Sequence, residues 1–230
     1  RNLAMGMVQG EFIAFLDVDD LFMPNALERL VDLMQSGYYG LAYGDVEIIN
    51  DDGKPLRRRN LRCRSGRVLG QMLRRYEISM VGAMIRKETL TEHGLSFNEA
   101  FGYGPDYDLF MRIIALGEVG VESACIAKNR ITRGSLTSKS LHLVAPELGY
   151  TLDELERLYP LALVGHEAAL KKAKEKLRYY EAVNLINQNE YATAREVLRR
   201  VRWSRWQFAV IYMLLLIHIP RPWLMRVFNR

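Results

Sequence analysis

The chain of 230 residues has little cysteine and little histidine, and the few present are scattered. Its two cysteines, Cys63 and Cys125, belong to no CxxC pair, and its four histidines form no cluster. A disulfide framework needs several cysteines, and a zinc site needs closely spaced cysteine or histidine ligands. The sequence therefore supports neither.

The chain also lacks an apolar run long enough for a membrane-spanning helix. The apolar run near its C-terminus, Phe208 to Ile219, covers 12 residues, whereas a spanning helix needs about 20. No signal peptide is recognisable, and the chain starts at Arg1 within a pattern typical of the middle of a domain. We therefore expect the sequence to be a fragment.

The positive charge is confined to the C-terminal end. Residues 171 to 230 contain 13 Lys and Arg and 4 Glu, a net charge of +9, whereas residues 1 to 170 have a net charge of −4. A basic tail suggests an anionic partner, and a solvated helix face is the simpler alternative. No nucleic-acid-binding motif is present, so we expect no nucleic-acid partner.

Aromatic and basic residues surround the apolar run of the tail. The tryptophans are Trp203, Trp206 and Trp223, and the arginines are Arg199, Arg200, Arg202, Arg205, Arg221 and Arg226. This composition is typical of a segment lying on an anionic membrane surface. A hydrophobic helix buried against the rest of the protein would have the same apolar pattern.

Strand and helix patterns alternate along residues 1 to 140. Apolar runs at Glu11 to Leu16 and Val119 to Ile131 predict strands, and Asp51-Asp52-Gly53 predicts a hairpin. Helical spacing follows Pro24, and Asp106 to Leu116 has acids in its first turn and a closing glycine. The alternation predicts an α/β domain with a mostly parallel sheet over residues 1–140, followed by a helical extension over residues 141–230.

Three carboxylates crowd the end of the first predicted strand, in FLDVDD at residues 15 to 20. Asp17, Asp19 and Asp20 would raise one another's pKa unless they are solvated, placed at a helix start or share a cation. Capping of the helix after Pro24 explains them as well as a metal site does.

Five sequence features together resemble the family-2 glycosyltransferases of the GT-A fold. In order they are RN at residues 1 and 2, GEFIAFLDVDD with Pro24, MIRKETLTEHGLSFNEAF, GPDYDLFMRIIALG and NRITRGSLT, which span about residues 1 to 138. The resemblance implies an inverting transferase that uses a nucleotide-sugar donor. It also implies that the first strands of the domain, with part of the nucleotide pocket, lie upstream of Arg1, so we expect this fragment alone to be inactive.

The resemblance implies a role for each candidate site residue. Asp19 would bind Mg²⁺ or Mn²⁺, because hard cations take oxygen ligands and neutralise the departing diphosphate. Asp17 would face the ribose or sugar of the donor, with Arg1 and Asn2 beside it. Asp106 would be the catalytic base that takes the proton of the acceptor hydroxyl, although its place at a helix start also suits an N-cap.

Two positions depart from the family pattern. Pro105 stands where many relatives have an acid before the base, and Thr132 stands where they have a histidine. Arg133 would then face the phosphates, and Thr132 would be a weaker ligand.

The resemblance therefore implies transfer of a sugar to a glycan or lipid-linked acceptor, in the synthesis of a cell-surface polysaccharide or glycolipid. We expect the protein in the cytoplasm, peripheral at the membrane. The departures leave a second hypothesis open, a non-catalytic transferase-like module that binds a glycan or a protein partner.

Overall fold

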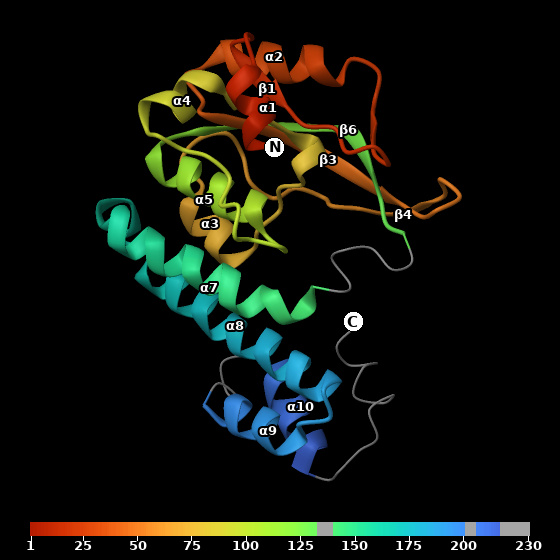
Figure 1. The fold of residues 1–230 in the computed structure, drawn as a ribbon, viewed down its shortest axis with the longest axis vertical. Coiled ribbons are helices and arrows are strands. Elements are labelled where there is room, and N and C mark those ends of the chain that lie inside the picture. The colour runs from red at the N-terminus through yellow and green to blue at the C-terminus, as the bar shows by residue number, and fades with distance from the viewer. Residues whose placement is uncertain (133–139, 201–205, 217–230) are drawn as a thin grey trace.

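The computed structural model describes residues 1–132, 140–200 and 206–216. Its centre is a six-stranded sheet (Figure 1). The strand order is β1 (Phe12–Ala14), β5 (Ala83–Arg86), β3 (Leu41–Ile49), β6 (Val119–Arg130) and β2 (Leu21–Phe22), and β4 (Pro55–Arg58) pairs with β3 beyond this path. All residues of β3 except Glu47 are buried, as expected of a strand covered on both faces.

The sheet is mixed, which corrects the expectation of a mostly parallel one. Only β3 and β6 pair in parallel among the described strands, and the other four pairings are antiparallel. An alternating order of strands and helices does not determine which strands become neighbours, and antiparallel pairs form without a helical crossover. The predicted hairpin around Gly53 is confirmed by the antiparallel pair of β3 and β4.

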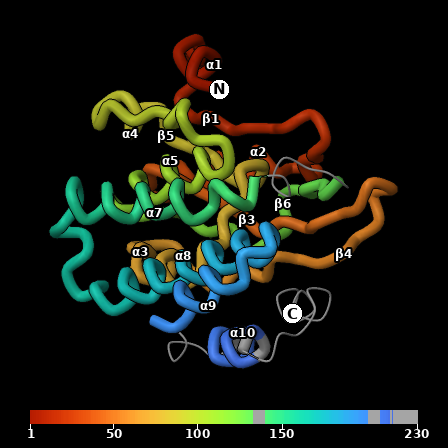
Figure 2. Tube along the Cα trace, turned by 60° about the horizontal axis from the view of Figure 1, so that its bottom comes forward, coloured from red at the N-terminus to blue at the C-terminus, as the bar shows by residue number. Residues whose placement is uncertain are grey.

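Helices cover both faces of the sheet, and the remaining ones extend away from it (Figures 1 and 2). They are α1 (Asn2–Met7), α2 (Ala26–Ser36), α3 (Leu69–Arg74), α4 (Lys87–Glu92), α5 (Pro105–Leu116), α7 (Leu141–Leu158), α8 (Glu167–Asn187), α9 (Tyr191–Arg199) and α10 (Trp206–Leu216). The α/β class with a helical C-terminal region is confirmed. Among the helices of the described residues, none combines the length and the hydropathy that a membrane-spanning segment requires.

The two faces of β3 belong to different hydrophobic clusters. Leu41 and Tyr43 join the cluster that contains residues of α3 and α5, while Ala42 and Val46 join the cluster that contains residues of α2. Side chains alternate between the faces of a strand, so neighbouring residues of β3 support opposite layers.

The helical extension contributes to two separate cores. Leu152 and Leu155 of α7 and Leu170 of α8 belong to the sheet's own cluster. The C-terminal half of α8 packs instead with α9 and α10 in a third cluster that includes Leu198 and Phe208. Apolar packing therefore continues across residue 140 from the sheet into α7.

Truncating one leucine in each core separates their contributions. Leu155 and Leu198 are both fully buried. We expect Leu155→Ala to lower the free energy of unfolding of the sheet region by about 2–5 kcal/mol and to accelerate hydrogen exchange of the β3 amides. Leu198→Ala should accelerate exchange only in the C-terminal half of α8, in α9 and in α10. Equal acceleration in β3 by both variants would contradict two independent cores.

Candidate active site

The three aspartates after β1 have different environments. Both carboxylate oxygens of Asp17 accept a hydrogen bond from the guanidinium of Arg1 at 3.4 Å. The side chain of Asp19 is exposed, and that of Asp20 is buried. Of the three neighbouring acids, Asp17 is paired with an arginine, Asp19 is exposed to solvent and Asp20 is buried.

Asp20 fastens this loop to β6. It accepts hydrogen bonds from the side-chain amide of Asn129, at 3.0 and 3.1 Å, and from the backbone N–H of Arg130 at 2.8 Å. The Arg130 guanidinium in turn donates to the carbonyl of Asp19 at 3.0 Å. Burial raises the pKa of Asp20 despite these bonds. Its contacts hold the backbone that carries Asp19.

Arg1 and Asn2 connect α1 to the segment around Phe97. The Asn2 amide donates to the carbonyl of Phe97 and to a carboxylate oxygen of Glu99, both at 2.9 Å, and its oxygen accepts the N–H of Phe97 at 3.0 Å. The Arg1 guanidinium lies 5.8 Å from the centre of the Phe97 ring. Asn2 is thus a structural link, and Arg1 is held beside Asp17.

Asp106 lies in the first turn of α5, as its sequence predicted, with Pro105 at the helix start. Burial raises the pKa of its carboxyl, while the backbone N–H groups of Tyr107 and of Asp106 itself, and the charges of Arg1 and Arg59, act in the opposite direction. Arg1 therefore acts electrostatically on Asp106 and is also the ion-pair partner of Asp17.

Asp108, two residues further on, has a different surrounding. Its buried carboxylate accepts hydrogen bonds from the Arg112 guanidinium at 3.1 and 2.6 Å and from the Thr151 hydroxyl at 3.0 Å. A carboxylate saturated in this way stabilises packing and is not available as a base.

Arg59 and Tyr76, which the sequence did not predict as site residues, both interact electrostatically with Asp106. Arg59 belongs to the arginine-rich stretch after β4, which resembles a solvated connector, yet it is half-buried and its carbonyl is held by the Arg75 guanidinium at 3.0 Å. The Tyr76 ring stands edge-on to that of Tyr107 at 4.8 Å. The Tyr76 hydroxyl is buried without a hydrogen-bond partner among the described residues. No local sequence pattern signals either contact.

The carboxylates of the candidate site suit a cation that also binds the phosphates of a substrate. Within the described residues, no three His, Cys, Asp or Glu side chains are grouped so that they could hold a metal ion. Mg²⁺ is commonly bound by one or two carboxylates together with substrate phosphates, and the exposed Asp19 fits such a role. Arg133 lies outside the described residues, and Thr132 before it is half-buried.

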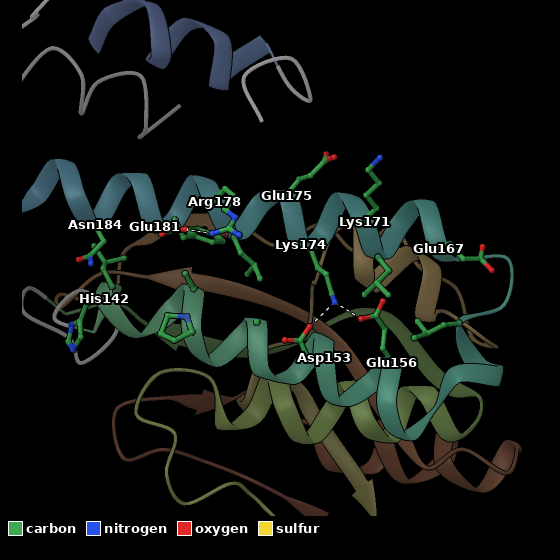
Figure 3. A pocket seen from close by; sticks show the side chains of 18 of the residues that line it. His142, Asp153, Glu156, Glu167, Lys171, Lys174, Glu175, Arg178, Glu181 and Asn184 are labelled. Atoms are coloured by element: carbon green, nitrogen blue, oxygen red, sulfur yellow. Dashed lines mark hydrogen bonds and ion pairs between the residues drawn. The ribbon is translucent and has the colours of Figure 1, made fainter. Parts of the chain in front are cut away.

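A cavity of about 960 Å³ lies elsewhere, between α7 and α8 (Figure 3). Lys174 of α8 crosses it to pair with Asp153 and Glu156 of α7. Its lining, as far as the structure describes it, contains neither Asp17, Asp19 nor Asp106. This cavity is therefore separate from the candidate catalytic residues.

The N-terminal part of the chain is similar in sequence to a known protein family. Residues 1–94 match the sequence model described as Glycosyl transferase family 2. An uncharacterized glycosyltransferase of Rickettsia bellii is 31% identical over 138 residues, which are 60% of this chain and 20% of the relative. The chain thus spans about a fifth of that protein's length.

A second relative and a solved structure are also similar to this chain. The Escherichia coli protein WfgD, a UDP-Glc:alpha-D-GlcNAc-diphosphoundecaprenol beta-1,3-glucosyltransferase, is 42% identical over 52 residues, 23% of this chain and 21% of WfgD. A crystal structure of S. aureus TarS 1-349 in complex with UDP-GlcNAc aligns with a TM-score of 0.49 at 14% identity, covering 89% of this chain and 72% of that one.

The raised pKa of Asp106 predicts a gain in stability from Asp106→Asn. The folded state holds the proton of Asp106 to higher pH than the unfolded chain, whose ordinary value is 3.8, so ionisation of this residue opposes folding at neutral pH. The variant should melt at higher temperature at pH 7, by about 2–4 °C for each kcal/mol gained. The difference should disappear as the pH falls to the ordinary value. A variant that melts lower at pH 7 would contradict this.

Proposed function

The chain belongs to glycosyl transferase family 2 through residues 1–94, and from this premise we propose that it transfers a sugar from a nucleotide-diphosphate sugar to an acceptor hydroxyl with inversion. Asp106 is the base of the proposed reaction. Inversion by direct displacement requires a carboxylate to take the acceptor proton as the hydroxyl attacks. The chain spans about a fifth of the length of the Rickettsia bellii relative, so the activity of the whole protein is part of this proposal.

The observation that carries the proposal is the shared arginine between two acids. Arg1 pairs with Asp17 and also contributes to the electrostatic environment of Asp106. A donor on the Asp17 side and an acceptor on the Asp106 side would then meet near Arg1, as transfer between two bound reactants requires. The raised pKa of Asp106 also favours a base, because proton affinity increases with pKa.

The donor side of the proposed site consists of Asp17, Arg1 and Asn2. Asp19 holds Mg²⁺ or Mn²⁺ in this proposal, and the cation supplies charge neutralisation for the departing diphosphate. Arg133 is proposed to face the phosphates, because guanidinium groups match phosphate geometry. Asn2 contributes chiefly by fixing Arg1, since its own polar atoms are bonded to Phe97 and Glu99.

We extend the proposal to the class of acceptor. WfgD is named for a UDP-sugar donor and a diphosphoundecaprenol-linked acceptor. A glycan or lipid-linked acceptor in polysaccharide or glycolipid synthesis fits that likeness, with the protein on the cytoplasmic side of the membrane.

Two substitutions separate the proposed roles. Asp106→Asn should abolish transfer and leave donor binding within about twofold, because it removes the proton acceptor and little volume. Asp19→Ala should weaken the Mg²⁺-dependent binding of the nucleotide-sugar. Calorimetry with and without the cation, together with a product assay, measures both effects. Asp52→Asn, at an exposed turn residue, is the matched control.

The same assays distinguish the proposed transferase from the non-catalytic alternative. Donor binding without transfer in the unmodified protein would favour a binding module. Equal loss of donor affinity in Asp106→Asn and Asp19→Ala would show that the roles are assigned wrongly.

We further propose that the tail binds an anionic membrane surface peripherally. Phe208 and Ile211 of α10 are buried in the core with α8 and α9, and Phe208 stacks on Tyr179 at 5.1 Å between ring centres. One face of α10 is therefore buried in the core, whereas the side chain of Met213 on the same helix is 59% exposed. Trp203 and Trp223 and most of the flanking arginines lie outside the described residues. The proposal rests on the exposed methionine and on the net charge of the tail.

Flotation with liposomes tests the membrane proposal. Binding should require anionic lipid, weaken with salt and disappear when residues 199–230 are deleted. Met213→Glu should weaken binding, because it places a charge on the exposed side of α10. Met7→Glu, at a methionine that is 75% exposed in α1, should not. Indifference of the unmodified protein to anionic lipid would refute the proposal.

A further inference from the structure

A single carboxylate of α7 holds the loop that leads into α5. Glu147 is buried, and its two oxygens accept the backbone N–H groups of Gly102 at 2.8 Å, Tyr103 at 2.9 Å and Gly104 at 2.9 Å. Hydrogen bonds to an ionised acceptor are roughly twice as strong as neutral ones. Three consecutive peptide groups are thus fixed by one side chain.

The fixed loop determines where α5 starts. Gly104 is the N-cap of this helix, and its carbonyl accepts the N–H of Asp108 at 3.1 Å. Asp106 lies two residues after the last peptide group that Glu147 holds. A shift of the loop would therefore move the Asp106 carboxylate with it.

The loop residues permit this close contact with α7. A Cβ atom at Gly102 would lie 2.9 Å from the side chain of Leu143, and one at Gly104 would lie 3.3 Å from Leu148. Both neighbours are α7 residues, and such distances are shorter than ordinary van der Waals contact. Glycine at these positions lets the loop backbone reach the carboxylate of Glu147.

A second contact between α7 and α5 lies one turn beyond Glu147. The Thr151 hydroxyl donates to Asp108 at 3.0 Å, and Asp108 is the ion-pair partner of Arg112. This contact joins the two helices without touching the loop. It therefore offers a matched comparison for the effect of Glu147.

We infer that Glu147 is a positioning residue for Asp106, which makes α7 a part of the active site. The inference rests on the proposed function, in which Asp106 is the catalytic base. Glu147 acts through the peptide groups of Gly102 to Gly104 and touches neither reactant. Its role is to keep the base aligned with the acceptor hydroxyl, where a misplacement of about 1 Å can cost roughly 100-fold in rate.

The test compares Glu147→Gln with Thr151→Val. Glutamine keeps the size of the side chain but removes its charge and one acceptor oxygen. We expect Glu147→Gln to lower kcat roughly 10- to 100-fold and to leave the donor KM within about twofold. Thr151→Val should lower the melting temperature with little change in kcat. Glu147→Asp, which keeps the charge but shortens the reach, provides the same comparison if the glutamine variant does not fold.

A second readout does not depend on activity. Carboxyl NMR titration should find that the pKa of Asp106 is raised in the unmodified protein and falls towards the ordinary aspartate value in Glu147→Gln, because the loosened loop admits water. Thr151→Val should leave it in place. Unchanged titration of Asp106, or equal losses of kcat in both variants, would overturn the inference. An unmodified protein that transfers no sugar would refute the proposed function, while the titration would still decide the role of Glu147.

Discussion

Hydrogen bonding of backbone N–H groups to buried carboxylates is the interaction on which the arrangement of the loops depends. The acceptors are Asp20, Asp45, Glu77 and Glu147. A buried carboxylate costs several kcal/mol unless its oxygens are bonded, so each of these acids stabilises the fold only with its loop in place. The loops after β1 and before α5 are held in this way, and so is the arginine-rich loop that carries Arg59.

Two of the candidate functional acids, Asp17 and Asp19, lie outside this pattern, and Asp106 shares only part of it. Asp19 is exposed, Asp17 has an exposed partner at 3.4 Å, and burial of Asp106 raises its pKa despite two backbone N–H groups. Acids that stabilise a fold have their acceptor positions filled, whereas an acid that binds a ligand or takes a proton must keep some free. Asp106 and Asp108 illustrate the difference two residues apart on one helix.

Local patterns of the sequence predicted the elements that local chemistry determines. The acids and closing glycine of α5, the turn at Gly53 and the apolar run of β6 are signals within a few residues. The neighbours of each acid are not local. Asn129 lies 109 residues from Asp20 and Glu147 lies 45 residues from Gly102, so FLDVDD alone could not tell the buried aspartate from the exposed one. The prediction of a mostly parallel sheet was wrong for the same reason, because strand neighbours are also distant in the sequence.

The described strands end before the helical extension begins, but the hydrophobic core of the sheet continues into α7. Strands end before residue 141 in the described chain, yet Leu152 and Leu155 complete the core beneath the sheet, and Glu147 completes the loop before the candidate base. These residues lie beyond residues 1–94, which carry the family match. The sheet supplies the acids of the candidate donor side, but the alignment of Asp106 depends on a buried charge in α7. A helix outside the family match therefore determines the geometry of the candidate acceptor side.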